Sequence, residues 1–372
     1  MEKSKEKKIA IVHDFLVQHG GAEKVLEIIA EMFPGAPIYT LLYDKNEMGS
    51  KFSDREIRTS FLQKFPKFLK KRYRFLLPFF IVVPEVFDLR DFDLVISSSG
   101  AWSKGIVTKL NTKHIAYIHS PMRFVWDYNE KYFKEKGVRP TLFKRIFMSY
   151  LRIWDYMAAQ RPEFLIANSE YTKQRINKYY RRESTVIYPA VDIAAGIDQK
   201  NTNENEEKDF FLVVSRLSGY KKVDIIVEAF NKLGLPLIVV GKGEQYEKLK
   251  KIAGENIKIL GWQNEDSLKK YYSSARAFVF IAEEDFGIAP VEAMKFGVPV
   301  VAFRSGGLLE IVEEGKTGEF FDAQTPEVLS DGIRRFMENE KSYDRIYIME
   351  KASVFSKDRF KKELESFIRG IE

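Results

Sequence analysis

Two glutamates stand out in the segment FVFIAEEDFGIAPVEAMKFGVPVVAF, residues 278–303. Glu284 and Glu292 flank the point where an apolar run changes to a helical pattern, with Pro290 in its first turn and Gly297 as its expected stop. Carboxylates accept hydrogen bonds from vicinal hydroxyls, and free N–H groups at a helix start bind ligand oxygens. The segment therefore predicts a polyol site. Taken alone, Glu292 could equally be a capping or helix-dipole partner.

A second pair of charged residues lies in the segment VVSRLSGYKKVDIIVEAF. Arg216 ends an apolar run, and Lys221 follows five residues later, before a helical pattern. Two cations at the carboxyl end of a strand can neutralise a diphosphate, Arg through a bidentate fork and Lys as a point charge. Either cation alone is more often a solvated surface charge, but its combination with the paired glutamates is seldom a coincidence.

The elements that must position these residues are short apolar strands, each followed by a helical segment, which predicts doubly wound parallel sheets. The chain of 372 residues is long enough for two such domains. We expect an α/β fold with two Rossmann-like domains facing a cleft: residues 1–190, residues 191–345, and a helical segment 346–372 that returns to the first domain. The expected strands are residues 8–15, 36–43, 92–99, 113–120 and 163–169, then 210–217, 235–242, 256–262, 276–282 and 298–303.

Two common nucleotide motifs are excluded. The string GKTG at 315–318 lacks the earlier glycine of a P-loop, because Glu310 stands there, and is better explained as a β-turn. The string VVGKGEQYEKL has Tyr246 where the third glycine of a dinucleotide fingerprint belongs. A hydride-transfer enzyme is therefore disfavoured.

The chain resembles the retaining glycosyltransferases of the GT-B architecture, family four, which use a sugar nucleotide. The segments that carry the resemblance cover most of the chain: HDFLVQHGGAEKV, HSPMRFVWD, IANSEYTKQRI, VIYPAVD, SRLSGYKKVDIIVEAF, EEDFGIAPVEAMKFGVPVVAF, SGGLLEIVEEGKTGEFF and FSKDRF. Within the family, the resemblance is strongest to enzymes that transfer mannose from GDP-mannose in surface-polysaccharide, lipopolysaccharide or lipid-linked glycan assembly. The alternatives are a UDP-sugar donor, such as UDP-glucose or UDP-GlcNAc, and a non-catalytic sugar-nucleotide sensor.

The resemblance implies roles for individual residues. Glu292 would hold the ribose, Glu284 the transferred sugar, and Arg216 and Lys221 the departing diphosphate. His119 would contact the donor sugar, although a buried histidine bonded to backbone is the simpler alternative. Asn168 and Ser169 could touch substrate or cap the following helix. The remaining donor contacts would come from backbone amides at Gly20, Gly21, Phe286, Gly287, Ile288, Gly306 and Gly307, with Ser305 beside them.

The implied reaction retains anomeric configuration, and we expect front-face displacement through an oxocarbenium-like transition state with cations in place of a metal ion. Asp91 and Asp93 spell Asp-x-Asp, but the pair starts a strand instead of ending one. We therefore expect no cofactor and no metal. The oligomeric state is left open by the sequence.

Positive charge is concentrated in the first half of the chain. Residues 1–190 hold 33 Lys and Arg against 21 Asp and Glu, whereas residues 191–372 hold 27 against 32. Residues 57–84 contain no acid and interleave cations with aromatic residues, which predicts contact with an anionic membrane, unless they form an ordinary solvated helix. The cations expected at a membrane or acceptor are Lys67, Lys70, Lys71, Arg72 and Arg74.

Several classes of protein and location are disfavoured. The chain has no cysteine, no signal-peptide core and no apolar run of membrane-spanning length, so we expect a cytoplasmic protein that could act at the inner face of the plasma membrane. A nucleic-acid-binding protein would also be basic. It would leave the acidic second half and the paired glutamates unexplained, and no nucleic-acid module is recognisable.

Overall fold

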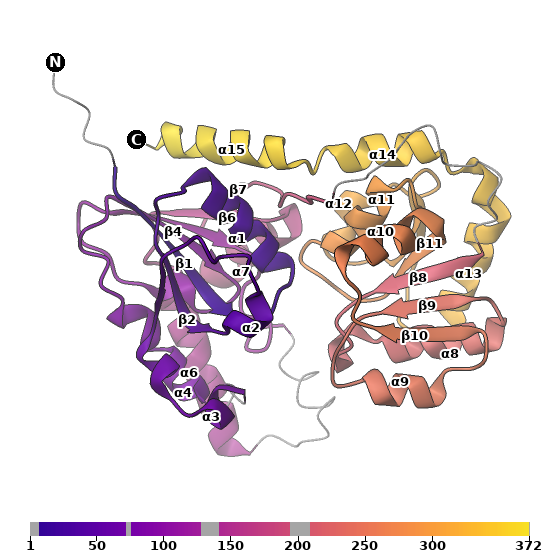
Figure 1. Ribbon diagram of the computed structural model, residues 1–372, viewed down its shortest axis with the longest axis horizontal. Coiled ribbons are helices and arrows are strands. Elements are labelled where there is room, and N and C mark those ends of the chain that lie inside the picture. The colour runs from indigo at the N-terminus through magenta and orange to yellow at the C-terminus, as the bar shows by residue number, and fades with distance from the viewer. Residues whose placement is uncertain (1–6, 72–75, 128–140, 194–208, 372) are drawn as a thin grey trace. The chain divides into compact units, whose positions relative to one another are not determined.

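Two parallel β-sheets organise the chain in the computed structural model, which describes residues 7–71, 76–127, 141–193 and 209–371 (Figure 1). The chain divides into two compact units, residues 1–190 with 360–372 and residues 191–359. Each unit has one sheet covered by helices, which confirms the predicted pair of doubly wound α/β domains.

In the described part of the first unit, the sheet has seven strands in the order β3-β2-β1-β4-β5-β6-β7, all parallel. The chain leaves β1 toward β2 on one side and later returns to β4 on the other, so the topological switch point lies between β1 and β4. The strands are β1 (Ile9–Leu16), β2 (Ile38–Tyr43), β3 (Ile57–Thr59), β4 (Leu94–Ser99), β5 (Lys113–Ile118), β6 (Phe164–Ala167) and β7 (Thr185–Val186).

The sheet of the second unit has the order β10-β9-β8-β11-β12-β13 and is also parallel throughout its described strands. Its switch point lies between β8 and β11, by the same reasoning. The strands are β8 (Phe210–Val214), β9 (Leu237–Val240), β10 (Ile257–Gly261), β11 (Ala275–Phe280), β12 (Val300–Phe303) and β13 (Gly318–Phe321).

Helices cover both sheets. Those of the first unit are α1 (Gly21–Met32), α2 (Lys45–Met48), α3 (Lys67–Lys71), α4 (Leu77–Phe80), α6 (Leu142–Ala158) and α7 (Glu170–Tyr180). Those of the second are α8 (Val223–Leu233), α9 (Tyr246–Ile252), α10 (Glu265–Ser274), α11 (Ile288–Lys295), α12 (Leu308–Ile311), α13 (Pro326–Asn339) and α14 (Arg345–Ser353), followed by α15 (Lys357–Gly370). Short 3-10 turns are η1 (Phe61–Lys64), η3 (Val83–Val86), η4 (Ser103–Gly105), η5 (Gly219–Lys221) and η6 (Glu340–Ser342).

The first sheet is buried on both faces because successive side chains of a strand point to opposite sides. On β1, Ile11 lies in one apolar cluster with Leu26 and Ile29 of α1. Its neighbours Ala10 and Val12 lie in the cluster on the other face. This double burial explains why the strands read as continuous apolar runs in the sequence.

The last helix belongs partly to the first unit. Phe360, Leu364 and Ile368 of α15 recur at four-residue spacing and are buried in the cluster that contains Ile11. The ring of Phe360 also packs edge-on against Tyr117 of β5, with 5.8 Å between ring centroids. The apolar stripe of α15 therefore returns the end of the chain to the first sheet, as the expected fold requires.

The ten predicted strands are all present, but β3, β7 and β13 were not foreseen. They contain only two to four residues each, which is too short for a periodic pattern to emerge from the sequence. Within the described ranges, none of the helices has the length and apolar composition that crossing a lipid bilayer requires.

Candidate active site

Polar side chains gather at the carboxyl ends of β1, β4 and β5, beside the switch point of the first sheet. The register of β1 and β4 places His13 opposite Ser98. The Ser98 hydroxyl lies 3.0 Å from His13 Nδ1 and 2.7 Å from Nε2 of His119, which directly follows β5. His119 is half-buried, whereas His13 and Ser98 are buried. The predicted site residue His119 is thus bonded to Ser98 of β4, and Ser98 links it to His13 of β1.

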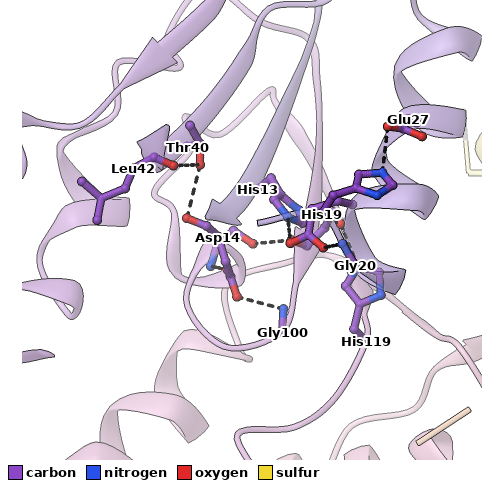
Figure 2. Close-up of polar contacts among 12 residues, drawn as sticks. His13, Asp14, His19, Gly20, Glu27, Thr40, Leu42, Gly100 and His119 are labelled. Carbon is purple, nitrogen blue, oxygen red and sulfur yellow. Dashed lines mark hydrogen bonds and ion pairs between the residues drawn. The ribbon is translucent and has the colours of Figure 1, made fainter. Parts of the chain in front are cut away.

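Asp14 fixes the loop that follows β4 (Figure 2). Its carboxylate accepts four backbone hydrogen bonds, from Gly100 at 2.9 Å, Ala101 at 2.6 Å, Trp102 at 3.0 Å and Ser103 at 2.6 Å. Successive N–H groups that converge in this way form an anion-binding nest. Here the chain fills the nest with its own carboxylate, so this loop is held rigidly at the end of the sheet.

The first loop and the β6 end show which predicted polar residues are structural. Gly20 precedes α1, and its amide donates to Glu23 Oε2 at 2.8 Å. The expected contacts of Gly20 and Gly21 with a ligand stay predictions. Ser169 caps α7 by accepting from the Thr172 amide at 2.9 Å, which confirms the capping alternative. Asn168 donates its side-chain amide to the His119 carbonyl at 2.9 Å and so supports the His119 backbone.

In the second unit, the structure pairs two predicted site residues. Lys221, at the end of η5 after β8, donates from Nζ to Glu284 Oε1, after β11. Burial alone would lower the pKa of Lys221, but the attraction of Glu284 outweighs it, and the pKa lies above its ordinary value. Arg216 is exposed and close enough to oppose this shift. Opposite charges therefore meet at the switch point of this sheet.

Two unpredicted glycines hold the loop that carries Arg216. Both glycines lie after β9. A Cβ atom on Gly241 would lie 1.8 Å from Ser215 O, and one on Gly243 would lie 2.2 Å from Leu217 O. The loop is tied by Leu217 N donating to Lys242 O at 3.0 Å. The glycines of the GKG string therefore allow two backbones to pack closely. Their role is structural, which agrees with the conclusion that this string is not a dinucleotide fingerprint.

Gly306 and Gly307 serve the Glu284 loop in the same manner. A Cβ atom on Gly306, whose φ is +63°, would lie 2.1 Å from Glu284 O, and one on Gly307 would lie 2.4 Å from Asp285 O. Gly307 also donates its amide to Glu284 O at 3.0 Å, so this amide is engaged by the protein. Gly287, with φ +114°, turns the chain into α11, which begins at the predicted Ile288. Phe286 is buried at this turn.

Glu292 lies in α11 and is 5% exposed. Tyr272 of α10 donates its hydroxyl to Glu292 Oε2 at 2.9 Å, and its ring stacks on Phe296. Burial, followed by the nearby charge of Glu292, raises the pKa of Tyr272 well above its ordinary value, so the tyrosine remains a donor. Tyr272 orients the carboxylate that was predicted to hold a ribose. The sequence offered no signal for this contact, because α10 is largely polar.

Other predicted residues lie away from these clusters. Asp93 accepts from the Lys8 amide at 3.0 Å just before β4, as expected for an Asp-x-Asp that starts a strand. Lys67 is exposed, and Lys70 Nζ donates to Gln63 O at 3.0 Å. Arg72 and Arg74 lie outside the described residues, as does the side chain of Lys71. Among the described side chains, no three potential ligands are grouped closely enough to hold a metal ion; metal independence stays a prediction.

The fold and these loops define a class: a protein of two Rossmann-like domains, as in the GT-B architecture, with polar or charged side chains at the switch point of each sheet. Two family models match successive parts of the chain. Residues 19–195 match the model described as Glycosyltransferase Family 4, and residues 196–351 match the one described as Glycosyl transferases group 1. The chain is therefore a glycosyltransferase of the GT-B type.

Curated relatives support this assignment. An uncharacterized glycosyltransferase of Methanocaldococcus jannaschii is 24% identical over 95% of this chain and 93% of its own length. The alpha-1,3/1,6-mannosyltransferase ALG2 of Saccharomyces cerevisiae is 25% identical, but over 49% of this chain and 46% of its own. The mannosyltransferase match thus covers about half of each chain.

Solved structures share the fold. HepE of Anabaena, in complex with UDP and glucose, superposes with a TM-score of 0.71 at 18% identity over 98% of this chain and all of that one. Sucrose-phosphate synthase of Thermosynechococcus elongatus gives a TM-score of 0.72 at 17% identity, with 97% and 99% covered. At these identities the likeness establishes the architecture alone.

Proposed function

We propose that this chain is a retaining hexosyltransferase that moves a sugar from a nucleotide diphosphate sugar to a glycan or lipid-linked acceptor. The observation that carries the proposal is the contact between Lys221 and Glu284 at the switch point of the second sheet. A cation suited to a phosphate and an anion suited to sugar hydroxyls lie side by side, as the junction between sugar and diphosphate requires.

In the proposed reaction, Lys221 and Arg216 bind the diphosphate, Glu284 and His119 bind the sugar, and Glu292 binds the ribose. The bond between the anomeric carbon and the diphosphate oxygen breaks as the acceptor oxygen bonds the same face of that carbon. The acceptor proton passes to the departing diphosphate, which leaves with the bonding electron pair. The cations stabilise the charge that develops on the leaving group, without a metal ion or cofactor.

GDP-mannose is the proposed donor, and the half-length match to the yeast mannosyltransferase supports it. A UDP-hexose is the alternative, because HepE was solved with UDP and glucose. A thermal-shift screen over GDP-, UDP- and ADP-sugars discriminates them, since a ligand at 100 times its Kd stabilises the fold by about 2.7 kcal/mol.

Transfer assays then test the reaction class. Incubation with the best-binding donor and an acceptor panel should give a glycoside whose anomeric configuration, measured by NMR, equals that of the donor. An inverted product would refute the proposed mechanism. Tight binding without transfer or hydrolysis across the whole panel would instead identify a sugar-nucleotide sensor.

We also propose that the first unit acts at an anionic membrane, and α6 supplies the observation that favours this. Its outer face exposes large apolar side chains at helical spacing, including Phe143 at 76%, Ile146 at 59% and Ile153 at 63%. Lys144 and Arg145 are exposed beside them. Apolar residues flanked by cations are typical of helices that lie in the lipid interface.

The inner face of α6 packs on the segment predicted to contact lipid. Trp154 donates to the Ile81 carbonyl at 3.1 Å, and Leu151 shares an apolar cluster with Phe80 and Val83. The predicted basic segment therefore lies beside the exposed stripe. The only acid on α6, Asp155, is buried, so the outer face is complementary to negative lipid headgroups.

Vesicle sedimentation tests this surface. Wild-type protein should bind vesicles with anionic lipid and not neutral ones, and Ile153→Glu should abolish binding. The control, Ile346→Glu, changes an isoleucine that is similarly exposed on α14 of the other unit. Equal binding by both variants would refute the proposal, and loss of a dimer in Ile153→Glu would show that a second copy covers this face.

A further inference from the structure

Four side chains form a row from the start of α1 to the end of β5. Glu23 Oε1 lies 3.5 Å from His13 Nε2, and His13 Nδ1 lies 3.0 Å from Ser98 Oγ. Ser98 Oγ lies 2.7 Å from His119 Nε2. Figure 2 shows His13, Gly20 and His119 grouped at this end of the sheet. The row thus links a buried carboxylate to the half-buried histidine that the proposed function assigns to the sugar.

The fold fixes every member of the row. Parallel pairing of β1 and β4 sets His13 opposite Ser98, and β5 follows on the other side of β4. Glu23 is held by the Gly20 amide, which donates to Oε2 at 2.8 Å. Glu23, His13 and Ser98 are each less than 9% exposed, so bulk water does not supply alternative partners.

The hydrogen bonds along the row have a defined direction from donor to acceptor. Burial would raise the pKa of Glu23, but its hydrogen bonds, chiefly the one with the His13 side chain, act in the opposite direction, and the pKa lies below its ordinary value. Glu23 is therefore ionised at neutral pH and only accepts, which places a proton on His13 Nε2. In the neutral form of His13, whose imidazole carries one N–H, Nδ1 then accepts and the Ser98 hydroxyl donates to it. The Ser98 oxygen then accepts from His119, whose neutral imidazole carries its proton on Nε2.

We propose that Glu23, His13 and Ser98 are positioning residues that hold His119 in the Nε2–H tautomer, so that its Nδ1 accepts a hydrogen bond from a hydroxyl of the bound sugar. This inference rests on the proposed function, which assigns His119 to the sugar. The three residues need not touch substrate. They act through the orientation and tautomer of one imidazole, as second partners of functional histidines do.

A Glu23→Gln variant reverses the direction of the hydrogen bonds along the row, because glutamine has nearly the same shape as glutamate but can donate. Because the Gly20 amide still requires an acceptor, the glutamine oxygen must take the place of Oε2, and its NH₂ group then faces His13 Nε2. His13 Nε2 becomes the acceptor and Nδ1 carries the proton. The Ser98 hydroxyl must donate to His119 Nε2, and the proton of His119 moves to Nδ1.

Long-range ¹⁵N–¹H NMR of histidine-labelled protein reads these tautomers directly. The chain has only four histidines, so substitution of each in turn assigns the spectrum. We expect Nε2–H at His13 and His119 in the wild type, Nδ1–H at both in Glu23→Gln, and a mixture at His119 alone in Ser98→Ala. Glu27→Gln is the matched control, because Glu27 lies on α1 like Glu23 and its Oε1 is 3.0 Å from Nε2 of another histidine, His19 (Figure 2).

An Nδ1–H tautomer of His119 in the wild type, or an unchanged His119 signal in both Glu23→Gln and Ser98→Ala, would overturn the proposal. Ser98→Ala keeps the test decisive if Glu23→Gln does not fold. A merely structural role for Glu23 would lower stability without moving the tautomer of His119.

Ligand titration separates this inference from the proposed function. The affinity of Glu23→Gln for the nucleotide sugar should fall about tenfold, while its affinity for the free nucleoside diphosphate stays that of the wild type. If no nucleotide sugar binds the wild type, the proposed function fails whatever the tautomers are. If the sugar nucleotide binds and Glu23→Gln loses no affinity, the link between the row and the sugar is refuted.

Discussion

Replacing Lys221 with alanine tests the charge arrangement on which the proposed chemistry depends. The Lys221 side chain is 14% exposed, and its ammonium lies against Glu284 and the faces of Tyr220 and Phe280, so water screens the charge only in part. At about 4 Å and an effective dielectric constant of about 20, the attraction between this ammonium and one negative charge of the departing diphosphate contributes about 4 kcal/mol. Each 1.4 kcal/mol corresponds to about tenfold in rate, so kcat should fall about a thousandfold.

The assay compares kcat with donor affinity, because the leaving diphosphate gains charge in the transition state. Donor affinity should change by much less than kcat. Lys232→Gln is the control, since Lys232 lies on α8 of the same unit and the change removes the same charge from its exposed ion pair with Glu327 of α13. Equal losses of kcat and donor affinity in Lys221→Ala would refute a role in the transition state.

Three further outcomes follow from the same structure. Asp155→Asn should lower the free energy of unfolding in urea by about 3–5 kcal/mol, because it leaves the buried Lys104 ammonium, 2.5 Å from Asp155, without its counter-charge; a loss below 1 kcal/mol would contradict this. Glu292→Gln should weaken nucleotide binding in calorimetry by about 1–3 kcal/mol, more than Tyr272→Phe, and the reverse order would exclude direct contact with ribose. EDTA should leave transfer unchanged, whereas lost activity restored by a divalent cation would refute the metal-free reaction.

The surface proposed to contact the membrane is only partly evident from the sequence. Charge is a local property, so the sequence alone indicates the basic run near Lys67. It does not indicate that the apolar residues of α6, such as Ile146 and Ile153, are exposed, because a stripe at helical spacing normally marks a buried face. Only the folded structure shows that this stripe is exposed while Leu151 and Met148 fill the core.

The sequence by itself determined the two parallel sheets, because apolar strands buried on both faces leave continuous local runs. It also identified the loops that carry Arg216, Lys221, Glu284 and Glu292, since strand ends and helix starts have local signatures. These assignments needed no knowledge of which segments meet in space.

Only the tertiary structure decided how those residues are paired. Lys221 reaches Glu284 across 63 positions, and His13 reaches Ser98 across 85, because strands distant in sequence become neighbours in each sheet. Tyr272 likewise finds Glu292 through the packing of two helices. Such contacts depend on strand order and side-chain packing, which act between distant segments and leave no periodic trace along the chain.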